Sequence, residues 1–387
     1  MVVTPMTTVR PAARSQKIQP ERRRLCTPVL MPGDEPFQLF TEGDPLYDAM
    51  IRAIAEARNE VAMESYIFAE DEIGWQFAEA LAARARAGVR VRLHLDAAGS
   101  LFWVSRRLDH FLRTSDIELR WFHRWHWSRP FQYNQRNHRK LLVVDGRKAF
   151  LGGFNIHREN SRKLYGERRW RDTHVAMTGP LVRQARNAYQ ALWEGQPFHS
   201  DLNAEPPSAV VLPNKSPDCQ HRLHCVFASM FGSARHRIEM TTPYLVPDEW
   251  TIKALEKAAR RGVAVRVLVP LKSDIAPIRW IAQRIQARLQ RKGIRVFGYR
   301  SRLLHAKTLT IDSEWASIGT ANMDYRSLFL NHELNLCARA PSLAAALERQ
   351  FETDLAEAEE LDASSGLRLP LTDRLLALLA WAARRWL

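Results

Sequence analysis

The sequence predicts an α/β fold built from two homologous halves, each an α/β sandwich, with one shared site at their interface. Three observations predict it: one short motif occurs twice, longer segments recur at nearly constant separation, and helical patterns alternate with short apolar runs. Alternation of helices and buried strands is typical of layered α/β domains. A chain of 387 residues is also long for one compact domain and comfortable for two of about 170 residues.

The repeated motif has the form His-x-Lys-x4-Asp. Its two copies are His138, Lys140 and Asp145 in the first half, and His305, Lys307 and Asp312 in the second. Each copy is followed, at the same offsets, by a glycine and an asparagine: Gly152 and Asn155, then Gly319 and Asn322. One such motif is ordinary on a strand, but two copies with matching continuations indicate a duplicated functional loop.

Around the first copy, residues 141–144 and 149–151 are apolar runs on either side of Asp145-Gly146. This pattern predicts a β-hairpin with a tight turn, and the second copy repeats it. Because side chains alternate along a strand, His138 and Lys140 should point to the same face. We expect the glycine and the asparagine where each hairpin ends, the glycine in a tight backbone turn and the asparagine as a donor near the site.

Longer segments repeat as well. ARAGVRVRLHLD at residues 85–96 matches ARRGVAVRVLVP at 259–270, and VAMESYIF at 61–68 matches IEMTTPYL at 238–245. The separations are similar: 174 residues from Gly88 to Gly262, 177 from Val61 to Ile238 and 167 from His138 to His305. Near-equal separations indicate that whole domains are duplicated. The two motifs should therefore meet between the halves, about a pseudo-twofold axis.

Each half is predicted to run helix, strand, helix, strand, a variable helical excursion and then the motif hairpin. Residues 46–57 and 76–87 place apolar side chains on one helical face. The expected segments are a disordered basic leader at 1–35, a first domain at 36–200, a proline-rich linker region at 201–217, a second domain at 218–365 and an amphipathic C-terminal helix at 366–387. The run 209–212 inside the linker region is also a candidate first strand of the second half.

Two such loops around one point would hold two histidines, two lysines and two asparagines. These cations and donors, without a cluster of carboxylate ligands, suit a phosphate or phosphodiester better than a metal. One imidazole can attack phosphorus while the other protonates the leaving oxygen, if the two are held in opposite protonation states. No cofactor is expected. The cluster Cys219, His221, His224 and Cys225 lacks a familiar zinc-ligand spacing, so no metal site is predicted.

The doubled motif resembles the signature of the phospholipase D superfamily, and within that superfamily the chain is most similar to the bacterial cardiolipin synthases. The resemblance extends from about Phe37 to about Glu359. It includes NQRNHRKLLVVDGRKAFLGGFNI around the first motif, MESYIFAEDEIG near the N-terminus and MTTPYLVPDE in the second half. The fold that this resemblance implies is a pair of phospholipase D-type α/β sandwich domains.

The resemblance also implies roles for the site residues. One motif histidine forms a phosphohistidine intermediate, and the other protonates the departing alcohol and later deprotonates the incoming one. The more usual assignment makes His138 the nucleophile and His305 the acid and base, and the near-symmetry of the site leaves this open. The remaining roles are oxygen binding by Lys140, Lys307, Asn155 and Asn322, orientation of the imidazoles by Asp172 and Glu333, and bracing of the hairpins by the motif residues Asp145 and Asp312. Glu64 and Tyr244 are weaker pocket candidates.

The charge balance is strongly basic, with a formal net charge of +15, which indicates polyanionic partners. Residues 277–302 contain eight basic and no acidic residues among apolar ones, the pattern of a basic amphipathic helix in a lipid interface. The first half carries Trp103, Trp121, Trp125 and Trp127 among arginines. Membrane contact is the favoured interpretation, and core packing or base stacking are the alternatives.

No transmembrane span is visible in the sequence, and the C-terminal segment is short for one. We therefore expect a peripheral protein on the cytoplasmic face of the bacterial inner membrane. The function implied by the resemblance is that of a cardiolipin synthase, which transfers a phosphatidyl group from phosphatidylglycerol to a second phospholipid and releases glycerol. A phospholipase D that forms phosphatidic acid and a phosphodiesterase or nuclease are the alternatives. No nucleic-acid partner is expected, and the oligomeric state stays open.

Overall fold

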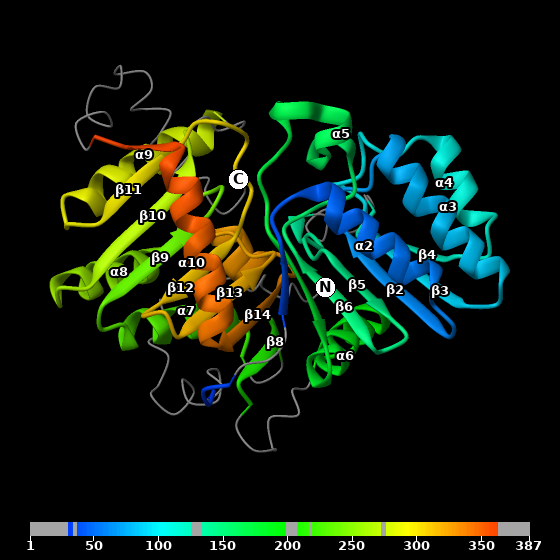
Figure 1. Cartoon of the computed structure of the whole chain (residues 1–387), viewed down its shortest axis with the longest axis horizontal. Helices are drawn as coiled ribbons and strands as arrows, with labels where there is room; N and C mark the ends of the chain where they lie inside the picture. The colour runs from blue at the N-terminus through cyan, green and yellow to red at the C-terminus, as the bar shows by residue number, and fades with distance from the viewer. Residues whose placement is uncertain are drawn as a thin grey trace, which may run out of the picture.

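Two α/β halves lie side by side, each built on one mixed sheet (Figure 1). The computed structural model describes residues 30–33, 37–124, 134–198, 207–216, 219–271 and 276–362. The expected C-terminal helix at 366–387, residues 1–29 of the expected leader, and Trp125 and Trp127 lie outside these residues.

The first sheet has the strand order β1-β7-β6-β5-β2-β3-β4. Its strands are β1 (Phe37–Phe40), β2 (Glu60–Ser65), β3 (Arg90–Asp96), β4 (Glu118–Phe122), β5 (Leu141–Val144), β6 (Lys148–Gly152) and β7 (His174–Thr178). Helices α2 (Gly43–Ala55), α3 (Glu72–Arg86) and α4 (Arg106–Arg113) pack on one face, and α6 (Pro180–Glu194) packs on the other. The short helix α5 (Arg162–Tyr165) lies between β6 and β7.

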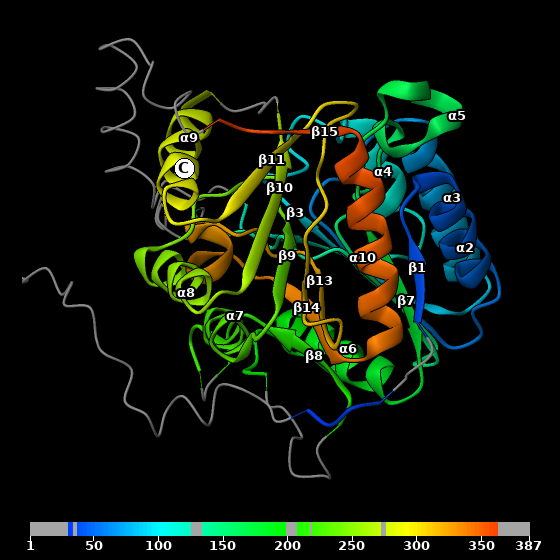
Figure 2. The ribbon, with the colours of Figure 1, turned by 60° about the vertical axis from the view of Figure 1, so that its left-hand side comes forward.

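The second sheet has the order β15-β11-β10-β9-β12-β13-β14-β8. Its strands are β8 (Ala209–Pro213), β9 (Arg237–Thr241), β10 (Ala264–Pro270), β11 (Arg295–Tyr299), β12 (Thr308–Ile311), β13 (Trp315–Gly319), β14 (Leu334–Arg339) and β15 (Ala358–Glu360). Helices α7 (Arg222–Ser233), α8 (Glu249–Arg260) and α9 (Ala276–Gln290) lie on one face, and α10 (Pro341–Ala356) lies on the other (Figure 2). A π-helical turn spans Arg326–Leu330.

The strand register repeats between the halves. Val61 of β2 faces Val144 of β5, and Ile238 of β9 faces Ile311 of β12. These pairs are related by the same separations, 177 and 167 residues, that the sequence repeats show. The prediction of two homologous α/β halves is therefore confirmed.

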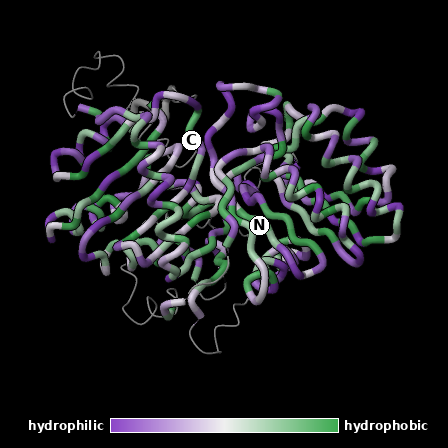
Figure 3. The backbone as a smooth tube through the Cα atoms, viewed as in Figure 1, coloured by the Kyte–Doolittle hydropathy of each residue, from purple (hydrophilic) through white to green (hydrophobic). Residues whose placement is uncertain are grey.

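One hydrophobic cluster crosses the boundary between the halves. It joins β6 and α6 of the first half to β13, β14 and α10 of the second, with Leu151, Ile318 and Leu334 all fully buried. Figure 3 shows hydrophobic stretches along the central strands and alternating colours along the outer helices. Because the core is shared, the two sheets hold each other in a fixed arrangement and the motif loops between them are positioned by both.

Two expected boundaries shift. The run 209–212, the candidate first strand of the second half, is strand β8 (Ala209–Pro213) and pairs with β14, so the second domain includes part of the expected linker region 201–217. Leu30, in the expected leader 1–35, is buried in the core of the second half, and the Gly33 N–H donates to the carbonyl of Arg339. The physical reason is that edge strands and short apolar segments gain burial that composition alone does not reveal.

The expectation of a lipid-facing helix within residues 277–302 is also wrong for its described side chains. Ile281, Ile285 and Leu289 of α9 are buried in the core of the second half. Arg288 on the same helix forms ion pairs with Glu249 and Glu256. The apolar face that the sequence pattern indicated is thus covered by protein. Among the residues described, none of the helices is long and apolar enough to cross a membrane.

Candidate active site

Two backbone bridges cross between the halves and carry the motif histidines. Asn137 pairs with His332, and Arg171 pairs with Leu304. The His138 N–H donates to the carbonyl of His332 at 3.0 Å, and the His305 N–H donates to the carbonyl of Arg171 at 2.8 Å. Each motif histidine therefore lies beside the residue that precedes a carboxylate of the other half.

Across these bridges, each half supplies a carboxylate to the motif histidine of the other half. Glu333 accepts from Nδ1 of His138 at 3.0 Å, and Asp172 accepts from Nδ1 of His305 at 2.6 Å. The Thr320 hydroxyl also donates to Glu333, at 2.6 Å. A carboxylate on Nδ1 fixes the tautomer of a neutral imidazole and directs the Nε2 lone pair toward a substrate.

The two motif lysines are buried beside these histidines. Nζ of Lys140 donates to the carbonyl of His138 at 2.8 Å, and Nζ of Lys307 donates to the carbonyl of His305. Within the described residues neither ammonium forms an ion pair with a carboxylate. Burial lowers the pKa of Lys307 to about 8, and burial together with Lys307 lowers the pKa of Lys140 to about 7. Two buried cations that form no direct ion pair with a carboxylate are available to bind an anion.

Nδ1 of His305 receives two contacts, from Asp172 and from Nζ of Lys307 at 2.8 Å. One ring nitrogen cannot donate to a carboxylate and accept from an ammonium at once. The shorter contact to the carboxylate requires Nδ1–H, so the ammonium is left to the His305 carbonyl and to a ligand.

The two carboxylates differ in their protonation. Burial would raise the pKa of Asp172, but Lys307 and His305 outweigh it and the pKa lies below its usual value. Burial raises the pKa of Glu333 to about 7. Burial and the neighbouring lysines lower the pKa of both imidazoles, to about 4 for His305 and well below the usual value for His138. Both imidazoles are neutral without a ligand, and only His305 faces a carboxylate that stays ionised.

The two asparagines are oriented differently. Oδ1 of Asn155 accepts from the Ile67 N–H at 3.1 Å, which leaves its amide nitrogen as a donor for a ligand. Asn322 bonds to Asp324, and its buried Oδ1 has no hydrogen-bond partner in the described part of the chain. In this orientation Asn155 matches the role of an oxygen-binding donor better than Asn322.

The motif aspartates lie at the far ends of the hairpins. Asp145 accepts from the backbone N–H groups of Arg58, Asn59 and Glu60, each at 2.8 Å. Asp312 accepts from three equivalent N–H groups at the start of β9. Asp145 is five positions along the chain from Lys140, about 16 Å in a strand. Both aspartates therefore hold the chain where it enters β2 and β9 and do not reach the histidines.

The glycines at the ends of the hairpins, Gly152 and Gly319, allow neighbouring backbone to pack directly against them. A Cβ on Gly152 would lie 2.4 Å from the carbonyl of Thr173, and one on Gly319 would lie 2.4 Å from the carbonyl of Leu334. Neither has a positive φ, so the tight turn expected at these two glycines is wrong, whereas the hairpin turn expected at Asp145-Gly146 is present, with φ of 51° and 62°. These glycines let the carboxylate-bearing segments pack directly against the hairpins.

Several residues near the histidines were missed by the motif. The centres of the Tyr66 and His138 rings lie 4.8 Å apart. Nζ of Lys140 lies 5.0 Å from the centre of the Tyr66 ring. Trp170 lies 5.5 Å from His305. Tyr66 follows β2 in the repeated segment MESYIF, so its place at the carboxyl end of a central strand was the available signal.

The two weaker pocket candidates, Glu64 and Tyr244, differ in their contacts. Glu64 is buried on β2 and accepts from the side chain of Asn137 at 3.2 Å, so it holds the residue before His138. Tyr244 follows β9, and its carbonyl accepts from the Thr242 hydroxyl. Glu64 thus acts on the site through the backbone of the first motif.

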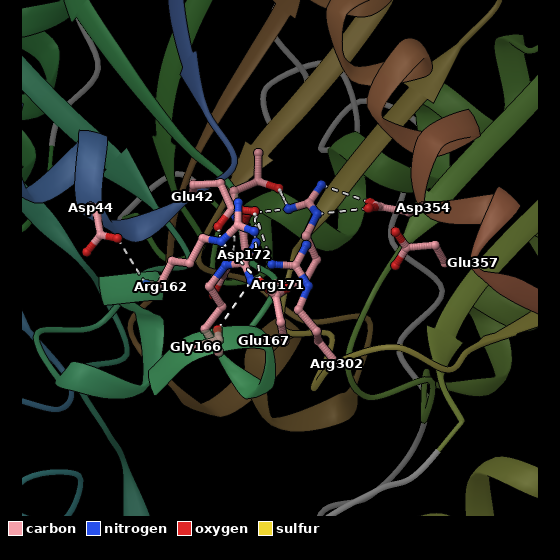
Figure 4. Close-up of polar contacts among 12 residues, drawn as sticks. Glu42, Asp44, Arg162, Gly166, Glu167, Arg171, Asp172, Arg302, Asp354 and Glu357 are labelled. Atoms are coloured by element: carbon pink, nitrogen blue, oxygen red, sulfur yellow. Dashed lines mark hydrogen bonds and ion pairs between the residues drawn. The ribbon is translucent and has the colours of Figure 1, made fainter. Parts of the chain in front are cut away.

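An ion-pair network between the halves surrounds Asp172 (Figure 4). Arg171 donates to both carboxylate oxygens of Asp354 on α10, at 2.9 and 2.8 Å, and to the carbonyl of Asp172. Glu42 binds Arg302 of the second half at 3.0 Å. The buried Arg171–Asp354 pair fixes the segment that carries Asp172.

Near the cysteines, Nε2 of His224 lies 3.3 Å from Asp248, in an ion pair. In the described ranges no group of three or more His, Cys, Asp or Glu side chains could hold a metal ion.

The duplicated fold and the doubled histidine–lysine site define a two-domain protein of the phospholipase D superfamily. More specifically, the chain belongs to the family described as cardiolipin synthase, PLD-like domain, whose sequence model matches residues 50–193 and 227–355.

Several curated relatives are similar over most of their length. A probable cardiolipin synthase of Bacillus subtilis is 30% identical, with 87% of this chain and 69% of the relative covered. A cardiolipin synthase of Staphylococcus aureus is 31% identical, covering 85% and 69%. One of Clostridium perfringens is 33% identical, covering 82% and 70%.

Solved structures show the same fold. A phosphatidylserine synthase of Haemophilus influenzae superimposes with a TM-score of 0.70 at 15% identity, covering 94% of this chain and 98% of that one. A polyphosphate kinase of Porphyromonas gingivalis gives 0.60 at 16% identity, covering 90% and 53%. At these identities the likeness concerns the fold alone.

Proposed function

We propose that this protein acts as a cardiolipin synthase, transferring a phosphatidyl group from phosphatidylglycerol to the hydroxyl of a second phospholipid. One observation carries the proposal: each motif imidazole is held through Nδ1 by a buried carboxylate of the other half, beside two buried lysines. The cardiolipin synthases among the relatives support the choice of substrate.

In the first step Nε2 of His138 attacks phosphorus, and the bond from phosphorus to the glycerol oxygen breaks. His305 supplies the proton that the glycerol oxygen needs to leave. His305 is the better suited of the two to carry this proton because its partner Asp172 stays ionised and stabilises an imidazolium. A phosphate anion between the lysines offsets their charge, which raises the pKa of His305 toward the protonated form.

In the second step the neutral His305 takes the proton of the incoming hydroxyl, whose oxygen attacks phosphorus. The bond from phosphorus to His138 breaks, and the product phospholipid leaves with both histidines restored. Lys140, Lys307 and Asn155 stabilise the charge on the nonbridging oxygens in both steps.

The loop after β3 supports a peripheral place on the membrane, for which we propose the cytoplasmic face of the inner membrane. Leu101 is 57% exposed and Phe102 is 91% exposed, and the basic residues Arg106 and Arg107 follow after Trp103, Val104 and Ser105. The neighbouring Ser100 donates to the carbonyl of Tyr66 at 3.0 Å, and the Tyr66 ring contacts His138. An apolar tip beside cations seats the site at a lipid surface.

The function is tested with purified protein and vesicles that contain phosphatidylglycerol, with products resolved by mass spectrometry. Cardiolipin and free glycerol are expected, and His138→Ala and His305→Ala should each remove the activity. Phosphatidic acid as the sole product would replace the synthase with a hydrolase.

The membrane contact is tested by cosedimentation with the same vesicles. Phe102→Ser should reduce binding several-fold and lower turnover on vesicles, while turnover on a soluble short-chain phosphatidylglycerol stays unchanged. Met31→Ser, at a site 52% exposed in the second half, is the matched control. Equal binding by both variants would rule out this loop as the contact.

A further inference from the structure

Arg139, between the two reactive residues of the first motif, is a buried cation that the carboxylates of Glu64 and Glu333 affect only at a distance. It is only 4% exposed. Its Nη1 donates to the carbonyl of Ala188 on α6 at 2.9 Å, and its Nε has no hydrogen-bond partner. Within the described residues it forms no ion pair with a carboxylate. Burying a guanidinium in this way costs free energy unless an anion accompanies it.

Arg139 lines a cavity of about 290 Å³ together with Lys215, His332, Gln196, Ser216 and Gln220. Besides apolar residues of α6 and the segment after it, the described lining holds basic side chains and amide or hydroxyl donors, and among these residues there is no aspartate or glutamate. Nζ of Lys215 donates to the carbonyl of Leu330 at 2.5 Å, which leaves two of its protons for a ligand. The volume is at the small end of ligand pockets, about 300–1,000 Å³.

The positive groups of this cavity lie close enough to affect one another. Burial and Arg139 lower the pKa of Lys215, and burial, Arg139 and Lys215 lower that of His332 well below its usual value. An anion among them would relieve both burial and mutual repulsion.

The duplicated bridges show what the cavity lacks. The pairs Arg171–Leu304 and His332–Asn137 are equivalent, so His332 occupies the position of Arg171. Arg171 binds Asp354 of α10 through two hydrogen bonds. Helices α6 and α10 both begin with a proline, and counted from it the residue of α6 in the position of Asp354 is Trp193. The carboxylate of that pair thus has no counterpart beside His332, which lines the cavity.

We propose that this cavity is a second anion site, which binds the phosphate group of a ligand through Arg139 and Lys215. It is separate from the catalytic site, because His138 turns to Glu333 while the next residue, Arg139, turns to α6. The phosphate is either free phosphate or the phosphodiester of a lipid headgroup. The site requires no assumption about the reaction.

The test uses the full chain with Lys140→Met and Lys307→Met, which removes the cations of the catalytic site. Inorganic phosphate and glycerophosphoglycerol, a soluble headgroup diester, are titrated separately by calorimetry. Binding of at least one probe is expected to persist in this background. Adding Lys215→Met should weaken it at least tenfold, whereas Lys163→Met, on an exposed lysine of α5, should not.

Arg139→Met should abolish binding, and Lys215→Met at the half-buried rim keeps the test valid if Arg139→Met does not fold. Binding of phosphate alone identifies free phosphate as the ligand, and binding of the diester identifies a headgroup. Absence of binding by both probes, or affinity unchanged by Lys215→Met, would overturn the proposal.

Discussion

Lys140 and Lys307 differ from ordinary lysines because both are buried together with no paired carboxylate. Their pKa values fall to about 7 and about 8. Each ammonium loses its proton as the pH rises through its pKa, so the anion site loses charge between about pH 7 and pH 8. The charge on the two motif lysines therefore changes close to neutral pH in the free enzyme.

This charge loss predicts an alkaline limb in the pH profile of kcat/KM, falling between about pH 7 and pH 8. The double variant Lys140→Arg and Lys307→Arg keeps its charge, because guanidinium does not deprotonate in this range. Its rate will be lower, since guanidinium has a different shape, but the alkaline limb should vanish. Steady-state rates from pH 5 to 10 check this, and a limb that stays in place would assign it to another group.

Gly153 is the residue whose replacement should act most specifically on Asp172. A Cβ there would lie 1.9 Å from a carboxylate oxygen of Asp172, so Gly153→Ala must displace the partner of His305. We expect a loss of about 10²-fold or more in kcat, with the fold retained. Gly232→Ala, on α7 where a Cβ meets no atom within 4 Å, is the control and should keep full activity.

At the scale of the elements, the hairpins hold the reactive residues at one end and their braces at the other. Asp145 and Asp312 each collect three backbone N–H groups at the start of the neighbouring strand. The aspartate of the motif therefore fixes the register between β5 and β2, and between β12 and β9.

Asp145→Ala separates bracing from catalysis. Loss of hydrogen bonds to a charged acceptor should lower the free energy of unfolding by about 1–3 kcal/mol, while kcat per folded molecule changes little. Denaturant unfolding and activity at low temperature measure the two effects. A loss of activity as large as that of His138→Ala, without loss of stability, would place Asp145 in the chemistry.

The hairpins and the succession of elements along each half could be predicted from the sequence, because alternation, the turn dipeptide and the repeat separations are local or periodic signals. The resemblance implied that Asp172 and Glu333 orient the imidazoles, but not which histidine each one holds, because Glu333 lies 195 residues from His138 and no local pattern records that contact. For α9, periodicity showed that Ile281 and Ile285 share a face, but a core and a membrane both accept such a face. The role of Asn322 likewise depended on the position of Asp324.

At the scale of the whole molecule, catalysis depends on how the two halves are held together. The shared core and the bridges at His332 and Arg171 set the position of each histidine relative to the carboxylate of the other half. A change at the interface should thus act on stability and on rate together.

Asp354→Asn tests this coupling. It leaves the buried Arg171 without its counter-charge, which should cost about 3–5 kcal/mol in the free energy of unfolding. It should also lower kcat, since Arg171 holds the segment of Asp172. Glu352→Gln, on the exposed side of the same helix, is the control. Loss of stability with an unchanged kcat in the folded fraction would mean that the interface between the halves does not affect the catalytic site.

The most direct test of a single site formed by both halves is to trap the intermediate. The His305→Asn variant, given a phosphatidyl ester of p-nitrophenol, whose leaving group departs without a proton, and then quenched, should accumulate one phosphatidyl group on the peptide that contains His138, as detected by mass spectrometry. The His138→Asn variant should carry none. A phosphatidyl group on the peptide that contains His305, or rapid turnover by either variant, would contradict the assignment of His138 as nucleophile and His305 as acid.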